Sequence, residues 1–196
     1  IIRLAAPQRF NFDTFDAQRS GEPSVIEILG RTHSRLVEWS DFQTPTLGAG
    51  LVARWEQPDD RTLLLHIDSA ARWHERPGLP PRRVSAADVV EHLRRSLAVA
   101  RSGTAPLAQR YADYASFEQV DSPAAGVVRI AFSSPDPFAF ATLAGEFALV
   151  QSPEAVALFG AATSPVDEKL VAGSGPFLFD GARDGSLVFR PAPGTH

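Results

Sequence analysis

The sequence predicts a mixed α/β (α+β) fold, because segments with the two-residue period of strands alternate with segments of helical period. The clearest strands are Thr62–Asp68 and Val127–Phe132, and the clearest helix begins at Ser85. Hydrophobic residues make up 44% of the chain and charged residues 21%, which is the ordinary balance of a globular protein. A length of 196 residues is enough for one core with a satellite subdomain.

The first part of the chain predicts a strand, a loop and a helix. Ile1–Ala6 is a short apolar run that we expect to be a buried strand, and Pro7–Gly21 is polar and aromatic, as in a loop. Apolar residues then recur near helical spacing at Val25, Ile26, Leu29, Leu36 and Val37. This pattern predicts a helix over 24–38, which Gly30 weakens.

The middle of the chain carries the strongest local signals. In the strand Thr62–Asp68, we expect Leu63, Leu65 and Ile67 to share one face. Ser85 and Asp88 stand at the N-cap and N3 positions of the following helix, which is the spacing of a capping box. The buried stripe of this helix is expected at Val89, Val90, Leu93 and Leu97.

The last part predicts shorter elements separated by turns. A turn is expected at Asp121–Pro123, before the strand Val127–Phe132. The other expected elements are a short helix over 109–116, helices beginning at Ser134 and Ser152, and a hairpin of strands Pro176–Asp180 and Ser186–Arg190.

Composition excludes several kinds of chemistry. The net charge is -4, which argues against a nucleic-acid binder with a basic face. There is no cysteine, which excludes disulfides, thiolate metal sites and cysteine nucleophiles. We find no signal peptide and no apolar run long enough to cross a membrane. If the intact protein is exported, we expect its targeting segment to lie outside these residues.

Several segments, taken in order, are similar to one known family. They are Leu51–Leu97, with its Ser85-Ala86-Ala87-Asp88-Val89-Val90, and then Val127–Phe132, Ser134–Phe138, Ser152–Val156 and Gly173–Phe177. In order and spacing they resemble the N-terminal part of the extracellular solute-binding proteins of the peptide/nickel ABC-transporter family. Thr14-Phe15-Asp16 resembles the loop that follows the family's first strand.

The resemblance implies a fold and a division into domains. It implies a type II periplasmic-binding-protein-like lobe I with an inserted α+β subdomain. The core of lobe I would comprise residues 1–45 and 170–196, and the inserted subdomain residues 46–169. The second lobe of the family would be absent from this chain.

The resemblance also implies a function without catalysis. The chain would be the lobe I part of the substrate-binding component of an ABC importer, which captures and delivers peptides or a similar small solute. Its partners would be that solute and the transporter permease, with no cofactor, no metal and no direct nucleic-acid contact. The location would be extracytoplasmic, in the periplasm or as a cell-surface lipoprotein, and contact with the membrane would occur only through a lipid anchor or the permease.

Two other functions remain open. Some bacterial transcription regulators carry a solute-binding-like sensor domain, and as such a domain the chain would be cytoplasmic and would sense a ligand. The segment upstream of Ile1 in the gene would distinguish the two, since one predicts a signal segment and the other a helix-turn-helix. An enzyme is the third possibility, but the chain has no Gly-x-Ser-x-Gly nucleophile motif, and we expect no catalytic residue.

The candidate ligand-binding residues lie in three segments. They are Asn11, Phe12, Asp13 and Thr14 in the first loop, Tyr111 and Tyr114 in the inserted segment, and Gly173, Ser174 and Gly175 before the hairpin. Loops at strand ends often face a ligand, tyrosine rings suit peptide side chains, and glycine allows close backbone approach. Each segment also has a structural interpretation: a solvated loop, core packing for the tyrosines, and a tight re-entry into the sheet for the glycines. The histidines, at 33, 66, 74, 92 and 196, show no metal-binding spacing, and we expect them at the surface.

Overall fold

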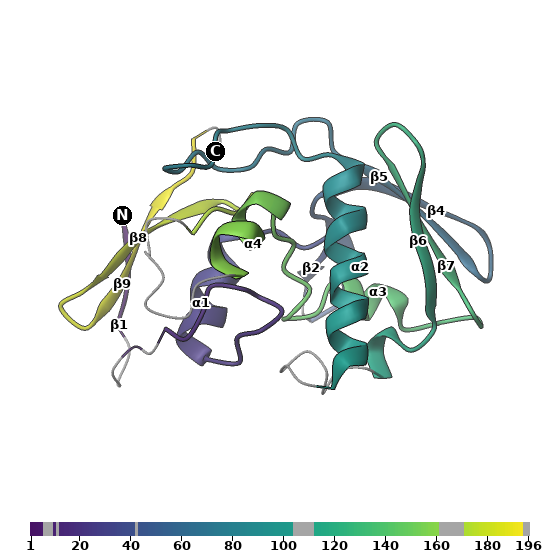
Figure 1. The fold of residues 1–196 in the computed structure, drawn as a ribbon, viewed down its shortest axis with the longest axis horizontal. Coiled ribbons are helices and arrows are strands. Elements are labelled where there is room, and N and C mark those ends of the chain that lie inside the picture. The colour runs from purple at the N-terminus through teal and green to yellow at the C-terminus, as the bar shows by residue number, and fades with distance from the viewer. Residues whose placement is uncertain (6–9, 11, 42, 104–111, 161–170, 194–196) are drawn as a thin grey trace.

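The computed structural model describes residues 1–5, 10, 12–41, 43–103, 112–160 and 171–193. In this part of the chain, a three-stranded sheet and a helix lie at one end, and a four-stranded sheet covered by a long helix lies at the other (Figure 1). A two-stranded ribbon connects to both. The mixed α/β fold expected from the sequence is therefore confirmed.

The three-stranded sheet joins the two ends of the chain. Strand β1 (Ile2–Ala5) pairs antiparallel with β9 (Ser186–Pro191), which pairs with β8 (Phe177–Arg183). The expected hairpin is confirmed, although β8 continues beyond Asp180 through an irregularity between Phe179 and Ala182. The prediction that the first strand is buried is wrong, because β1 is an edge strand and Ile2 is 39% exposed.

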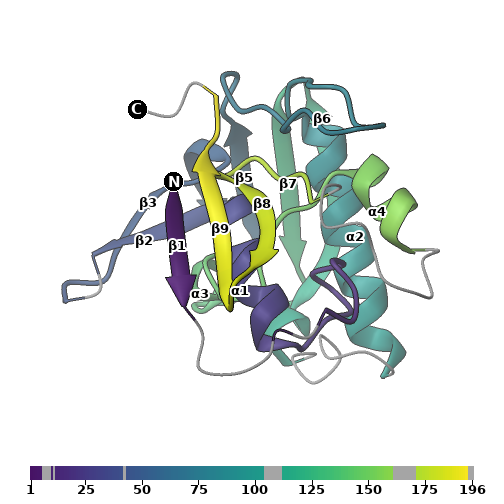
Figure 2. The same ribbon diagram turned by 90° about the vertical axis from the view of Figure 1, so that its left-hand side faces the viewer.

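The first helix is shorter than its apolar pattern predicts. Helix α1 (Pro23–Thr32) ends where His33 takes an extended conformation, so the prediction of a helix over 24–38 is wrong beyond Thr32. The chain then forms β2 (Val37–Asp41), which pairs with β3 (Thr46–Ala49) in a ribbon that projects from the body (Figure 2). Leu36 and Val37, which fit the helical period, are buried in the hydrophobic core instead, and Val37 is the first residue of β2.

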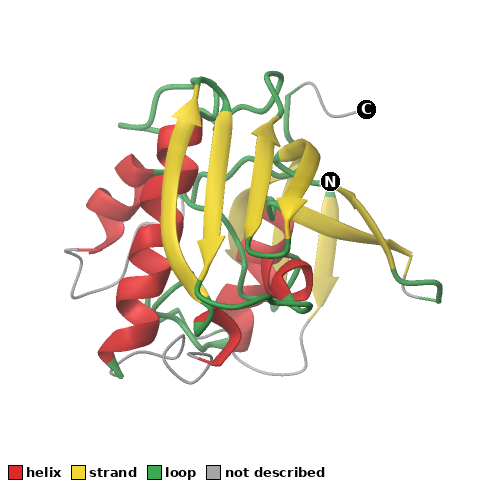
Figure 3. Ribbon diagram, turned by 90° about the vertical axis from the view of Figure 1, so that its right-hand side faces the viewer, coloured by secondary structure: helices red, strands yellow, loops and turns green. Residues whose placement is uncertain are grey.

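The four-stranded sheet has the order β4 (Val52–Asp59), β5 (Thr62–Ile67), β7 (Val127–Phe132) and β6 (Phe117–Ala124). All neighbouring strands are antiparallel, and helix α2 (Ala86–Ser102) lies across one face (Figure 3). The predicted strands β5 and β7 are confirmed. The predicted turn at Asp121–Pro123 is wrong, because β6 runs through it with a register shift between Asp121 and Ala124 and turns at Gly126.

Helix α2 begins as its sequence predicts. The Asp88 backbone N–H donates to the Ser85 Oγ at 3.2 Å, and the Ser85 N–H donates to the Asp88 carboxylate at 2.9 Å. The same carboxylate accepts from the Trp73 indole and the Arg82 guanidinium, which also binds Glu154 at the start of helix α4 (Pro153–Gly160). The capping box therefore also joins two helices.

Removal of the capping hydroxyl has a small predicted cost. Ser85→Ala is expected to lower the free energy of unfolding by about 1 kcal/mol, because one helix N–H loses its acceptor. Urea unfolding followed by circular dichroism measures the effect. Ser102→Ala, at the far end of the same helix, is the matched control. An equal loss in both variants would contradict a capping role.

The helices expected after Ser134 and Ser152 differ in outcome. The prediction of a helix beginning at Ser134 is wrong, because the helix in this region, α3 (Ala139–Leu143), begins five residues later and is only five residues long. Helix α4 is confirmed with Ser152 as its cap, since the Ala155 N–H donates to the Ser152 Oγ at 3.0 Å. The short helix expected over 109–116 lies partly outside the described residues, and a single helical turn is present at 112–114.

Two hydrophobic clusters form the interior. Cluster one lies between α2 and the four-stranded sheet, and cluster two between α1 and the three-stranded sheet. Leu36 and Val37 belong to cluster one, whereas Leu79, Leu149 and Ala155 belong to cluster two. The division into a core of 1–45 and 170–196 and an insert of 46–169 remains a prediction. None of the described helices has both the length and the apolar character needed to cross a membrane.

Candidate functional site

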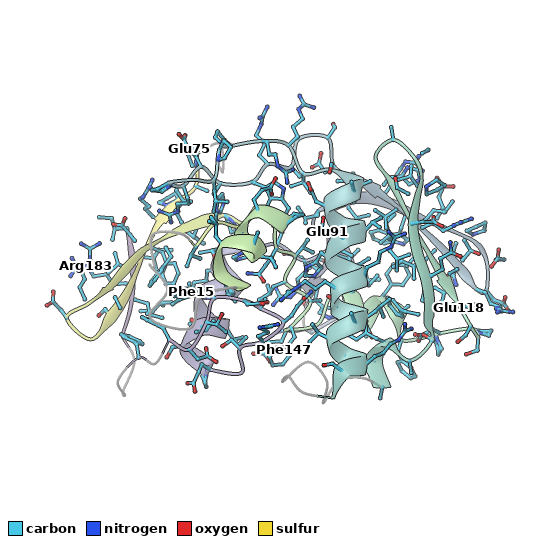
Figure 4. The ribbon with its side chains drawn as sticks, in the orientation of Figure 1. Phe15, Glu75, Glu91, Glu118, Phe147 and Arg183 are labelled. Atoms are coloured by element: carbon cyan, nitrogen blue, oxygen red, sulfur yellow. The ribbon has the colours of Figure 1, made fainter. Side chains whose placement is uncertain are left out.

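A groove of about 500 Å³ runs along helix α1. One wall is the face of α1 that carries Ile26, Glu27 and Gly30, and the other wall is Glu146 and Phe147. Figure 4 labels Phe147, which lies between the α1 region and the foot of α2. The volume is within the range of pockets that hold small ligands.

Hydrogen bonds hold the two walls together. The Arg35 Nε donates to the Gly145 carbonyl at 2.8 Å, and the Val150 N–H donates to the Ser34 carbonyl at 3.0 Å. The Arg35 carbonyl in turn accepts from the Leu51 N–H at 2.8 Å. These hydrogen bonds, one from a side chain and two between backbone groups, fix the residues that flank the groove.

The groove carries charges of both signs. Arg31 and Glu27 form an ion pair at 2.6 Å across one turn of α1. Arg35 uses only its Nε, so its terminal nitrogens have no partner among the described residues. Glu146 is exposed, and its carboxylate likewise has no ion-pair partner among them. One cation and one anion are therefore available to a ligand.

Gly30 keeps the groove open at its centre. A glycine in a helix interior costs about 1 kcal/mol relative to alanine. Outside its own helix, no heavy atom of the described residues lies within 4 Å of the position that a Cβ of residue 30 would take, and the residue does not have a positive φ. Packing within the described residues therefore gives no reason for glycine at this position.

The first predicted segment mainly supports the fold. Phe12 contacts Phe15 with ring centroids 5.5 Å apart, within cluster two; Figure 4 labels Phe15. The Asp13 carboxylate accepts from Thr14 N–H at 2.7 Å and from Ser20 Oγ at 2.6 Å, which closes the loop on itself. Asn11 lies outside the described residues. A ligand contact from this loop remains a prediction.

The loop continues into a buried network that no sequence pattern indicated. Asp16 is fully buried and forms an ion pair with Arg95 of α2. Gln18 donates to the Ser96 hydroxyl at 2.6 Å, and Gln151 donates to the Phe15 carbonyl at 2.7 Å. These contacts join the loop to α2 and to the segment before α4, so the polar groups stabilise the join between the two clusters.

The Gly173–Gly175 turn passes very close to the end of α1. A Cβ on Gly173 would lie 1.9 Å from the Thr32 carbonyl oxygen, and a Cβ on Gly175 would lie 2.9 Å from the Thr32 carbonyl carbon. The Gly175 N–H donates to that oxygen at 2.9 Å. This close approach accounts for both glycines by backbone packing. A ligand contact from Gly173, Ser174 or Gly175 remains a prediction.

Of the two predicted tyrosines, the structure describes Tyr114, which it does not bring to the first loop. Tyr114 is 5% exposed and packs edge-on against Phe117 in cluster one, with ring centroids 5.4 Å apart. Phe12 packs in cluster two. Tyr111 lies outside the described residues. Tyr114 thus has the core packing that the sequence also allowed, and its ligand contact remains a prediction.

The expectation of surface histidines is wrong at three positions. His33, His74 and His92 are 2%, 8% and 7% exposed. Burial lowers the pKa of His33 to about 3 and the pKa values of His74 and His92 to about 4, and nearby arginines lower the pKa values of His74 and His92 further. His66 is half-buried on β5, and His196 lies outside the described residues.

Two of the three buried rings, those of His74 and His92, accept hydrogen bonds from backbone N–H groups. The His74 Nδ1 accepts from the Gly173 N–H at 3.2 Å, and its Nε2 lies 2.8 Å from the Gly175 carbonyl. The His92 Nδ1 accepts from the Gln151 N–H at 3.4 Å. Because a ring nitrogen that accepts from an N–H is unprotonated, these two histidines are neutral. Among the described residues, no group of three acidic, histidine or cysteine side chains could hold a metal ion.

Solved structures with a similar fold are solute-binding proteins. OppA from Haemophilus influenzae, in complex with the peptide RPPGFSPFR, matches 94% of this chain with a TM-score of 0.74 and 21% identity. The dipeptide-binding protein of a Pseudoalteromonas species, in complex with Met-Leu, matches 91% with a TM-score of 0.71 and 19% identity. The PBP AgaA of A. tumefaciens, in complex with agropinic acid, matches 95% with a TM-score of 0.73 and 20% identity.

These similarities confirm the predicted fold, which is that of a periplasmic-binding-protein lobe. The chain spans between 35% and 37% of the length of the three structures, consistent with the N-terminal lobe. No family model matches the chain, and no curated protein sequence matches it. At these identities, the comparisons establish the fold alone.

The residues that line the groove were missed by the sequence analysis. Among the described residues, no predicted site residue lines it, and its described lining comes from α1 with its flanks and from Glu146 and Phe147, more than a hundred residues away. Gly30 was the one sequence feature that could have indicated the groove, because a glycine inside a helical pattern weakens the helix and usually has a packing or functional cause.

Proposed function

We propose that the chain is the ligand-binding lobe I part of a solute-binding protein that captures peptides or a similar small solute. The observation that carries this proposal is the match of more than nine-tenths of the chain to solute-binding proteins at TM-scores above 0.7. The preformed groove along α1 supports it, because a binding protein needs a concave surface with fixed polar groups.

The proposal is of binding without catalysis. The buried histidines are held neutral inside the fold, where they pack against backbone groups and do not face the groove. The charged residues of the groove can orient a ligand by hydrogen bonds, which is sufficient for reversible capture. In the complete protein, a second lobe would close over the ligand.

The same proposal includes delivery to a transporter outside the cytoplasm. The permease of an ABC importer would be the partner, and the periplasm or the cell surface the location. The division into a lobe core and an inserted subdomain belongs to this proposal too. Its support is the order of the family-like segments along the sequence together with the shared fold.

Native mass spectrometry of the purified chain tests the proposal. An adduct with the mass of a short peptide or other small solute is the expected result, and fragmentation would identify it. A sample that has been unfolded, dialysed and refolded is the control, and it should regain the adduct only when the solute is added back. Turnover of the added solute into products would contradict a purely binding role.

A further inference from the structure

We propose that the groove along α1 binds a short extended peptide, whose free carboxylate is received by Arg35 and whose main chain passes over Gly30. This inference rests on the proposed function and specifies the subsite and the contacts that it uses. Among the described residues, the groove has the length, the unpaired charged groups and the lining glycine that such a ligand requires.

The dimensions fit a peptide of a few residues. The lining residues of α1 extend from Pro23 to Arg31, and eight residues of helix rise about 12 Å. An extended peptide advances about 3.3 Å per residue, so this length accommodates three or four residues. The volume of about 500 Å³ agrees with a ligand of this size.

Arg35 is the group best placed to receive a carboxylate. Its Nε is held by the Gly145 carbonyl at 2.8 Å, and its backbone carbonyl is held by the Leu51 N–H, so the side chain is anchored. The two terminal nitrogens remain, and together they can donate both hydrogen bonds of a bidentate carboxylate contact. The other guanidinium in the groove, that of Arg31, is already paired with Glu27.

Gly30 supplies the space for the ligand main chain. Gly30 lines the groove, and outside its own helix no described heavy atom lies within 4 Å of the position of a Cβ, so a side chain here would take up open space beside the groove. The helix would be more stable with almost any other residue. A glycine that weakens its helix and borders an open groove is expected where another backbone must approach closely.

Gly30→Leu separates binding from folding. The substitution is expected to raise the urea midpoint of unfolding, since leucine favours the helix, and to abolish peptide binding, since its side chain fills the groove. A glycine needed only for folding would give the opposite pair of results. Gly30→Ala, with a smaller side chain, is expected to raise the midpoint and weaken binding less.

The probe is the tripeptide Ala-Ala-Ala, titrated into the isotope-labelled chain and followed by the backbone amide signals. We expect shifts at Gly30, Arg31, Arg35 and Glu146. Binding is expected to weaken about tenfold when the peptide carboxylate is amidated or when Arg35→Gln removes the guanidinium that donates to it. Arg54→Gln, on the distant strand β4, is the matched control and should leave the affinity unchanged.

The outcomes distinguish this inference from the proposed function. Shifts confined to other residues, unaffected by Gly30→Leu, would overturn the groove as the subsite while the binding function stands. Equal binding of the peptide and its amide would overturn the role of Arg35. Absence of any shift at millimolar peptide would overturn both the subsite and peptide capture by this chain. If Arg35→Gln does not fold, Gly30→Leu and the amidated peptide still decide the question.

Discussion

Gly173→Ala is expected to destabilise the protein by about 3 kcal/mol or more, the upper part of the range for overpacked sites. The added methyl group would lie 1.9 Å from the Thr32 carbonyl oxygen and 2.8 Å from the His33 ring. The closest contact joins two backbone segments, at the end of α1 and before β8, and neither can move like a flexible side chain.

Movement of the turn would also break the hydrogen bonds that fix it. The Gly173 carbonyl accepts from the His74 N–H at 2.8 Å, and the Gly173 N–H donates to the His74 ring at 3.2 Å. The Gly175 N–H donates to Thr32 at 2.9 Å. These groups are buried, and each unsatisfied one costs about 1–3 kcal/mol. A small shift that relieves the clash is therefore itself unfavourable.

Equilibrium unfolding in urea, followed by tryptophan fluorescence and circular dichroism, measures this effect. Gly30→Ala is the matched control, because the same methyl group is added where nothing lies within 4 Å, and it is expected to stabilise by about 1 kcal/mol. If Gly173→Ala is insoluble, Gly175→Ala, with closest contacts near 3 Å, should give a smaller measurable loss. Equal midpoints for Gly173→Ala and the parent protein would contradict the close approach.

The elements that the sequence predicted correctly are those with local causes. Helix α2 is defined by Ser85 and Asp88, three residues apart, and by a regular apolar stripe, so neighbours in the sequence determine it. Strands β5 and β7 have apolar runs bounded by turns. These signals need no knowledge of the rest of the chain.

The errors have causes distant in the sequence. Helix α1 ends at Thr32, although the apolar pattern continues, because the Gly173–Gly175 turn packs against that point. Strand β6 runs through Pro123 because it is an edge strand of the sheet, where a proline is tolerated. Burial of His74 depends on the same distant turn.

The candidate groove was beyond sequence reasoning for the same reason. Its walls come from α1 and from Gly145–Phe147, and the bond that joins them links residues 110 positions apart. No pattern in either segment indicates the other. Gly30 is the kind of signal that a sequence can carry, since a glycine weakens a helix locally and, in the structure, lines this groove.

Acidification from about pH 7 to about pH 5 is expected to destabilise the protein strongly, through its buried histidines. In the unfolded chain, a histidine titrates near 6.5, whereas in the folded chain His74 and His92 titrate near 4 and His33 near 3. Between these values, the unfolded state binds more protons than the folded state. The free energy of unfolding therefore falls with falling pH, by up to about 1.4 kcal/mol per pH unit for each histidine.

The hydrogen bonds of the buried rings explain why protonation destabilises the folded state. Protonation of the His74 Nδ1 or the His92 Nδ1 would replace an accepted hydrogen bond by two opposed N–H groups. Cations add to this cost, since Arg76 and Arg190 lie near His74, and Arg95 lies near His92, where Asp16 only partly offsets it. His33 is disfavoured as a cation by its burial, and a positive charge on His74 or His92 would disfavour it further.

Urea unfolding at several values between about pH 7 and about pH 5 tests this prediction in a range above the ordinary titration of carboxyl groups. His92→Asn, which keeps an acceptor near the Nδ1 position but does not titrate, is expected to reduce the slope of stability against pH by about one third. The same substitution at His66, whose side chain is 22% exposed, controls for the effect of asparagine itself. A free energy of unfolding that stays constant over this range would contradict the prediction. It would mean that the buried rings bind protons in the folded state as readily as in the unfolded state.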